Sequence, residues 1–225
     1  MTEKIHWVIS NYNQDPTVII KELDGSYEVY NQGETHFFPQ ELTEKCFHQT
    51  KHSGHNISDY FKFIIDHYND LPEVSGFIKG NLFPRHITKE LFLSRKKIEG
   101  MVPFYGESKS YKAQKHRLNP FKFVAQQIAP GVYLEITNDW YCKCRPKGKY
   151  YPTLNSYFEA FFSREVPNYI TFTPGACMKV PKENILRWSC DTYKKLYEVV
   201  TYEHFPVEAF HAERCMLYLF MYPLE

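Results

Sequence analysis

Short apolar runs alternate with amphipathic stretches along the chain, and each predicts one structural element. A helix is expected over residues 57–68, where apolar side chains recur at helical spacing, with Asn56 or Ser58 as its N-cap. Strands are expected where a short apolar or alternating run ends in polar or turn-forming residues. These strands lie at residues 5–10, 27–30 and 74–78.

The C-terminal half continues the alternation. Residues 154–162 predict a helix and 169–172 a strand, and Pro181 suits the first position of a helix running to about Val200. Pro206 opens a last helix through Met221. Glycine, proline and basic residues punctuate residues 100–149, which predicts mainly surface loops there, either simply solvated or closing over phosphates. The pattern predicts an α/β fold with a central, mainly parallel sheet flanked by helices.

Composition narrows the classes of protein. A length of 225 residues suits a single domain, with 43% apolar and 24% charged residues, which excludes disorder as the main state. The net charge of +1 gives no sequence-wide reason to bind nucleic acid. No secretory signal or membrane-length apolar run is present, so we expect a soluble, cytoplasmic protein without a membrane span and with its six cysteines reduced.

Several signatures of known chemistry are absent. The chain has no GxGxxG after a strand, no GxxxxGK[ST] and no GxSxG. Cys142 and Cys144 have no second pair at zinc-ligand spacing. His48, His52 and His55 could imitate a metal trio, but no apolar stripe accompanies them, and ordinary loop histidines are favoured. No metal site is predicted.

Ligands of α/β sheets bind beyond the carboxyl ends of the strands. That rule places Asn11, Asn31 and residues 79–81 around one crevice. Two C-terminal segments also stand out. In residues 172–181, small side chains would let a ligand approach the backbone. In residues 210–215, Glu213 is either a general base oriented by Arg214 or half of a surface ion pair.

The motifs themselves resemble a family. The chain is similar to a domain-of-unknown-function family described in fungi, bacteria, algae and large algal viruses. The likeness covers over half the chain, and it departs at Asn56, where the family usually shows Glu, and in the insertion at 100–149. The matching pieces are YNQG at 30–33, YFKFIIDHYNDLP at 60–72, FIKG at 77–80, PGAC at 174–177 and AER at 212–214.

This family is in turn similar in organisation to GT-A glycosyltransferases, single α/β domains that use nucleotide sugars. The resemblance implies a donor-binding half at 1–99, the basic insertion at 100–149 and an acceptor half at 150–225. It implies Glu213 as the general base and Asp139 as a second catalytic acid. The alternative for Asp139 is an acidic loop residue without a catalytic role. Donor binding is expected from Ser10, Asn11, Asn31, Lys79, Gly80, Asn81 and His86, and acceptor binding from Trp140, Gly175, Ala176 and Arg214.

The resemblance thus implies an inverting glycosyltransferase whose nucleotide-sugar donor is a UDP-sugar, with UDP-xylose and a viral capsid glycan among the candidates. The acidic metal motif of such enzymes would fall at residues 79–81, which hold no carboxylate, so a bound Mn²⁺ or Mg²⁺ ion lacks support. Two other classes stay open: a non-catalytic carbohydrate-binding module, which would not need Glu213, and a nucleotide-dependent hydrolase, which would need an acid cluster.

Overall fold

The computed structural model describes residues 4–34, 46–106, 115–116, 119–123, 125–136, 147–163 and 167–221. Asp139 and Trp140 lie outside the described residues, as do residues 107–114, 117–118, 124 and 137–146 of the basic stretch.

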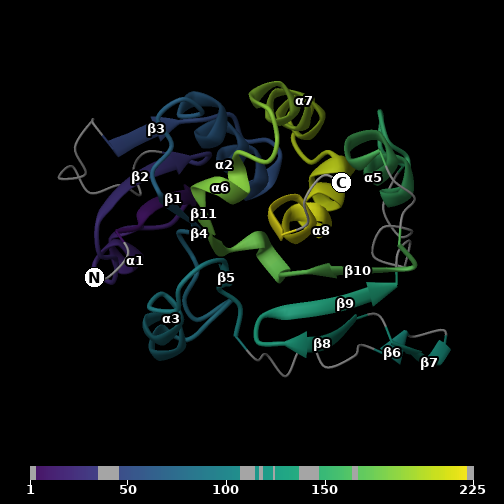
Figure 1. The fold of residues 1–225 in the computed structure, drawn as a ribbon, viewed down its shortest axis with the longest axis horizontal. Coiled ribbons are helices and arrows are strands. Elements are labelled where there is room, and N and C mark those ends of the chain that lie inside the picture. The colour runs from purple at the N-terminus through teal and green to yellow at the C-terminus, as the bar shows by residue number, and fades with distance from the viewer. Residues whose placement is uncertain are drawn as a thin grey trace.

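A six-stranded sheet with strand order β3-β2-β1-β4-β11-β5 forms the centre of the fold (Figure 1). Strands β3, β2, β1 and β4 are parallel, whereas β11 runs antiparallel to both β4 and β5. The order 3-2-1-4 is that of doubly wound α/β proteins, and the predicted α/β fold is confirmed. The strands are β1 (His6–Asn11), β2 (Ser26–Asn31), β3 (Phe47–Gln49), β4 (Val74–Lys79), β5 (Val102–Pro103) and β11 (Met178–Pro181).

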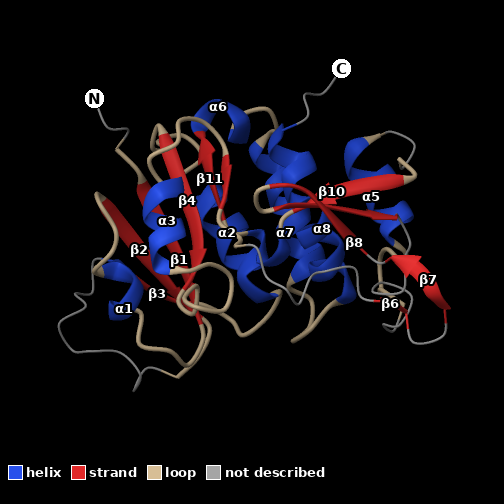
Figure 2. Cartoon of the chain, turned by 90° about the horizontal axis from the view of Figure 1, so that it is seen from below, coloured by secondary structure: helices blue, strands red, loops and turns tan. Residues whose placement is uncertain are grey.

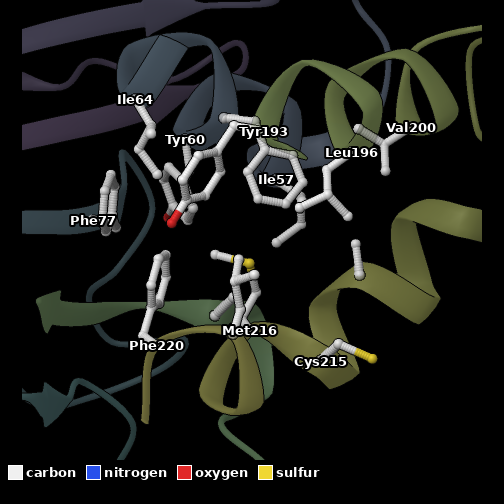
Figure 3. Packing of buried hydrophobic residues seen from close by; sticks show 14 of the residues in the cluster. Ile57, Tyr60, Ile64, Phe77, Tyr193, Leu196, Val200, Cys215, Met216 and Phe220 are labelled. Carbon is white, nitrogen blue, oxygen red and sulfur yellow. The ribbon is translucent and has the colours of Figure 1, made fainter. Parts of the chain in front are cut away.

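Helices cover both faces of this sheet. Alternate residues of β1 point to opposite faces: Trp7 packs against Phe92 of α3, while Val8 belongs to the core under α2. The core that contains Val8 is the larger of the two. In it, Phe77 of β4 stacks on Phe220 of α8 with ring centroids 6.1 Å apart (Figure 3). One face carries α1 (Thr17–Ile20) and α3 (Lys89–Arg95), the other α2 (His55–Asp66), α7 (Cys190–Val200) and α8 (Val207–Met221).

A second, antiparallel sheet of order β10-β9-β8 lies beside the central sheet, with β10 packed against α8 (Figure 2). Its strands β8 and β9 come from the stretch predicted to be mainly loops, and that expectation was wrong for them. They form because β8 and β9, which are neighbours in the chain, pair with each other. The other edge of β9 pairs with β10, which packs against α8. The strands are β8 (Ala125–Ala129), β9 (Val132–Ile136) and β10 (Tyr169–Phe172), and a separate pair is formed by β6 (Lys115–His116) and β7 (Asn119–Phe123).

The predicted helix boundaries were right in part. Helix α5 (Leu154–Phe162) and α8 match their expected ranges. The expected long helix from Pro181 is instead the end of β11, a single turn α6 (Lys182–Ile185) and then α7. It divides because Ser189 caps a new helix, its hydroxyl accepting from the backbone N–H of Thr192.

The predicted cap of α2 was also wrong. Its N-cap is Gly54, at φ 69°, and the first helical residue, His55, also has a positive φ of 54°. Asn56 and Ser58 therefore lie inside the helix, and their side chains bond to other segments. Glycine at 54 meets the left-handed conformation without a steric penalty.

Cys46, Cys177, Cys190 and Cys215, the cysteines among the described residues, are not joined to one another by disulfides. No helix in the described ranges combines the length and apolar character required to cross a bilayer.

Candidate functional site

A pocket of about 400 Å³ opens at the carboxyl ends of the parallel strands. Five of the predicted donor-side residues line it together: Ser10 and Asn11 at the end of β1, and Lys79, Gly80 and Asn81 at the end of β4. Strands β1 and β4 are hydrogen-bonded neighbours, so their ends meet at one edge of the sheet. The strand-end rule that selected these residues from the sequence therefore brings them to one cavity.

Other lining residues were not selected from the sequence. Gln32 follows β2, one position after the predicted Asn31, and the same rule applied one residue further would have found it. His52 and His55 precede or begin α2, and the spacing argument assigned them to an ordinary loop. The remaining lining residues come from three loops and the first turn of α2: Tyr12, Gln14, Asn56, Arg85 and Phe205.

Asn31 does not line the pocket but lies behind it, fully buried. Its Nδ2 donates to the carbonyl of Gly33, which turns its Oδ1 toward Asn11. Asn11 Nδ2 donates to that Oδ1 at 3.2 Å and to the Gln14 carbonyl at 3.0 Å. Asn31 therefore orients Asn11 and has no contact with the cavity itself.

Asp59 is a buried carboxylate that no sequence pattern singles out. It lies on α2, and its three hydrogen-bond donors come from the ends of three strands. Ser10 Oγ donates to Oδ2 at 2.6 Å, Gln32 Nε2 to Oδ2 at 2.8 Å and Thr50 Oγ1 to Oδ1 at 2.9 Å. Burial raises the pKa of Asp59 to about 7, although these hydrogen bonds lower it.

Lys79 and His86 meet at the backbone of Gly175. A Cβ at position 175 would lie 2.8 Å from the His86 ring and 3.4 Å from Lys79 Nζ, and Gly175 has φ 76°. Both ring nitrogens of His86 are buried, with no hydrogen-bond partner among the described residues. Burial, reinforced by the charges of Lys79 and Arg85, lowers the pKa of His86 to about 3, so the ring is neutral.

Glu213 lies on α8 beside this group, with 19% of its side chain exposed. Burial alone would raise its pKa, but Arg214, Lys79, a hydrogen bond from the Gly175 backbone and His55 outweigh it and lower the pKa. Glu213 is therefore ionised at neutral pH. The segments at 175 and 213, far apart in sequence, therefore meet in the fold.

Arg214 does not face the pocket. It is 2% exposed, and its guanidinium binds Glu135 at 2.6 Å and Glu213 at 2.9 Å and covers the Phe172 ring at 3.9 Å. Arg214 thus orients Glu213, one of the two roles expected for it, and does not contact an acceptor in the pocket. Ala176 is likewise buried, with a φ of 50°.

Aromatic rings form the rim of the pocket. Tyr12 and Phe205 are about half exposed, and both contact His52: Tyr12 stacks on it at 4.2 Å and Phe205 meets it edge-on at 5.8 Å. Exposed rings beside a polar cavity offer flat apolar surfaces to a ring-shaped ligand.

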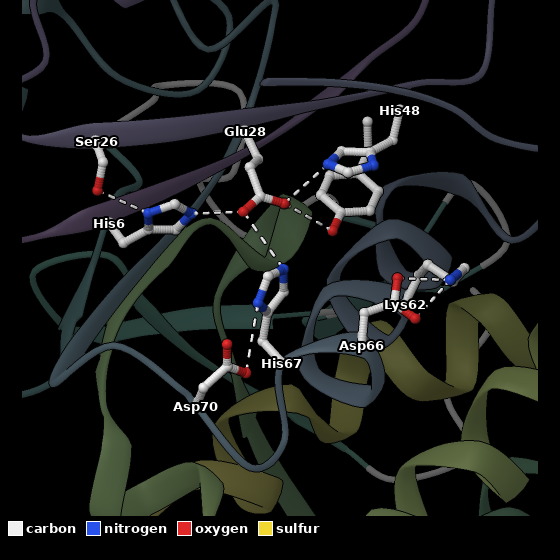
Figure 4. Close-up of polar contacts among 9 residues, drawn as sticks. His6, Ser26, Glu28, His48, Lys62, Asp66, His67 and Asp70 are labelled. Carbon is white, nitrogen blue, oxygen red and sulfur yellow. Dashed lines mark hydrogen bonds and ion pairs between the residues drawn. The ribbon is translucent and has the colours of Figure 1, made fainter. Parts of the chain in front are cut away.

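A second polar cluster occupies the same sheet away from the pocket (Figure 4). Glu28, in the middle of β2, is surrounded by His6, His48 and His67, whose Nε2 atoms lie 3.3, 2.9 and 3.4 Å from its carboxylate oxygens. Burial by itself raises the pKa of Glu28, but the hydrogen bond from His6 and the charges of His67 and His6 lower it to about 2. His48 therefore belongs to this cluster, apart from His52 and His55.

Within the described ranges, no group of three or more His, Cys, Asp or Glu side chains is arranged to hold a metal ion. The geometry defines an α/β protein with a polar pocket at its strand ends. The cations Lys79 and Arg85 line this pocket, and Lys79 also lies near the neutral imidazole of His86 and the ionised carboxylate of Glu213 around Gly175.

The family comparison agrees with the resemblance seen in the motifs. The family model described as a protein of unknown function (DUF3431) matches residues 7–223, and the chain belongs to this family. No curated protein and no solved structure matches the chain.

Proposed function

We propose that this protein is an inverting glycosyltransferase that moves a sugar from a nucleotide sugar, most simply a UDP-sugar, to a glycan hydroxyl. The observation that carries the proposal is the arrangement at Gly175. Its backbone lies close to the ammonium group of Lys79 and donates a hydrogen bond to the ionised carboxylate of Glu213. Such a site has a cation for a leaving diphosphate and a base for an incoming hydroxyl.

The diphosphate is assigned to Lys79 and Arg85. Lys79 ends β4 inside the pocket, and its ammonium forms no ion pair with any described residue. Arg85 is exposed and lines the same cavity. Charge that develops on a leaving diphosphate is stabilised by preorganised cations, and here these cations replace the missing acidic metal motif.

Glu213 is assigned to the acceptor. Its carboxylate takes the proton of the acceptor hydroxyl while the oxygen attacks the anomeric carbon and the bond to the diphosphate breaks. Attack opposite the leaving group inverts that carbon. Arg214, fixed by Glu135, and the Gly175 N–H hold the base in place.

The test compares Glu213→Gln with wild type across a panel of UDP-sugars, measuring released UDP and transferred sugar. A general base contributes roughly 100- to 10,000-fold to the rate, so we expect turnover to fall by that factor while UDP-sugar affinity stays near native. Glu198→Gln, on the exposed surface of α7, is the matched control and should retain full activity.

Native turnover by Glu213→Gln would exclude Glu213 as the base. The carbohydrate-binding module predicts a different pattern, with glycan binding, no release of UDP from any donor, and no difference between Glu213→Gln and wild type.

A further inference from the structure

Several side chains of the pocket can both donate and accept hydrogen bonds. In four of them, the donor groups are already bonded to other atoms of the protein. Ser10 gives its only proton to Asp59 Oδ2. Gln32 Nε2 donates to the same carboxylate, to Ser58 Oγ and to the His55 carbonyl. A ligand therefore meets the lone pairs of Ser10 and the carbonyl oxygen of the Gln32 amide.

The two asparagines follow the same rule. Asn56 Nδ2 donates to the Gly175 carbonyl at 2.9 Å, and Asn11 Nδ2 donates to Gln14 and Asn31. Two of these acceptors are backbone carbonyl oxygens. The third is the Asn31 Oδ1, whose amide is oriented because its Nδ2 donates to the Gly33 carbonyl, so the orientation of both amides is determined. Each Oδ1 is buried and lacks a donor among the described residues, although Asn11 is only 1% exposed and Asn56 only 5%.

Gly80 keeps the space in front of Asn11 clear. A Cβ at position 80 would lie 2.0 Å from Asn11 Oδ1, so any other residue would occupy the place from which a ligand could reach that oxygen. A buried carbonyl oxygen without a donor is costly, and a ligand that supplies a donor removes this cost.

Two further residues of the lining have the opposite character. Lys79 and Arg85 are donors only and carry positive charge. The pocket therefore offers hydrogen-bond acceptors from Ser10, Asn11, Gln32 and Asn56, and cations from Lys79 and Arg85.

We infer that the acceptor atoms of Ser10, Asn11, Gln32 and Asn56 form a recognition surface for neighbouring hydroxyl groups of an anionic, phosphate-bearing ligand. Asp59 is the positioning residue of this surface, because its carboxylate holds Ser10 and Gln32 with their donors turned inward. The inference deepens the proposed function and rests on it for the choice of UDP as a probe.

The experiment uses two matched ligand pairs at pH 8, where Asp59 is ionised. The first pair is UDP and 2′,3′-dideoxy-UDP, and the second is glucose 1-phosphate and cyclohexyl phosphate, which share a six-membered ring and a phosphate. Calorimetry on wild type should show the hydroxylated member of each pair binding more tightly, roughly tenfold where two hydroxyls are bonded.

Two variants separate recognition from stability. Ser10→Ala and Thr50→Val each remove one hydrogen bond to Asp59, but only Ser10 lines the pocket. We expect Ser10→Ala to lower the preference for the hydroxylated ligand several-fold and Thr50→Val to leave it within about twofold.

Equal affinities within both pairs would overturn the inference, as would equal loss of preference in the two variants or no binding by either hydroxylated ligand. A preference for glucose 1-phosphate without UDP binding would support the surface and contradict the proposed nucleotide-sugar donor. Tight UDP binding with no hydroxyl preference in either pair would overturn the surface alone.

Discussion

Two carboxylates, the partly buried Glu28 and the fully buried Asp59, have pKa values shifted in opposite directions. Glu28 is surrounded by three imidazoles, and its pKa is lowered to about 2. Asp59 receives hydrogen bonds only from neutral groups, and burial raises its pKa to about 7. Burial raises the pKa of both, so the difference comes from the charge of the partners.

The difference separates a stabilising region from a functional one. The attraction between the ionised Glu28 carboxylate and the histidines outweighs the cost of removing that carboxylate from water, so ionised Glu28 stabilises the fold. Asp59 in its ionised form lowers stability, yet it fixes two side chains of the pocket. Strain of this kind is tolerated where a site requires it.

The largest expected effect follows from replacing the pocket carboxylate, Asp59→Asn. The folded-state pKa of about 7 exceeds the ordinary value of 3.8, so Asp59 contributes stability below pH 4 that is lost as the pH rises to 7. As the pH rises across this window, the free energy of unfolding of the variant should therefore increase relative to that of wild type, by up to about 4 kcal/mol. Urea unfolding at pH 4 to 8 measures it.

Asn can keep its Oδ1 toward Ser10 and Gln32 and donate its Nδ2 to the Thr50 hydroxyl, so the variant should fold. The tyrosines whose pKa Asp59 raises, Tyr30, Tyr60 and Tyr197, stay neutral over this range and do not distort the comparison. Parallel pH profiles for the two proteins would contradict the raised pKa.

The next effect has the opposite sign and comes from Glu28→Gln. The folded-state pKa is below the ordinary 4.5, so Glu28 contributes stability above pH 4.5 that is lost as the pH falls to 2. The variant should be less stable than wild type at pH 7, by at most about 3 kcal/mol, and the gap should close near pH 2.

Guanidinium unfolding from pH 7 to 2 provides this measurement. Glu183→Gln, an exposed glutamate on α6, should show no such gap. A Glu28→Gln variant as stable as wild type at pH 7 would contradict the stabilising role of Glu28. Weakened UDP binding by this variant would contradict the separation of Glu28 from the functional region.

The smallest effect concerns the cation of the pocket, Lys79→Ala. Hydrogen bonds to charged groups contribute about 1.5–3 kcal/mol, so UDP affinity should fall roughly 10- to 100-fold while that of uridine changes little. Calorimetry compares the two ligands, and Lys62→Ala, a lysine paired with Asp66 on the surface of α2, serves as control. Equal losses for UDP and uridine would show that Lys79 does not meet the diphosphate.

Local patterns predicted much of the fold. The apolar runs located β1, β2 and β4, and the strand-end rule located Ser10, Asn11 and Lys79 in the pocket. These predictions succeed because burial and strand direction are set by residues close together in the sequence.

What the sequence could not supply depends on partners distant in the chain. Arg214 is buried because Glu135 and Phe172 meet it from the second sheet, whose strands did not follow from the local pattern. Asp59 resembles any polar helix residue until the strand ends that donate to it are assembled. Asn31 and Gln32 are adjacent, and only the backbone geometry decides which one faces the cavity.

The hydrogen bond from Asn56 to Gly175 has a consequence for biosynthesis. It joins residues 119 positions apart, so this bond cannot form until the ribosome has made residue 175, although most of the residues that line the pocket precede position 86. Long-range contacts of this kind form late because closing the intervening loop is entropically unfavourable. A molecule truncated before position 175 therefore lacks the complete pocket, and ligand binding distinguishes finished, fully folded chains from incomplete ones.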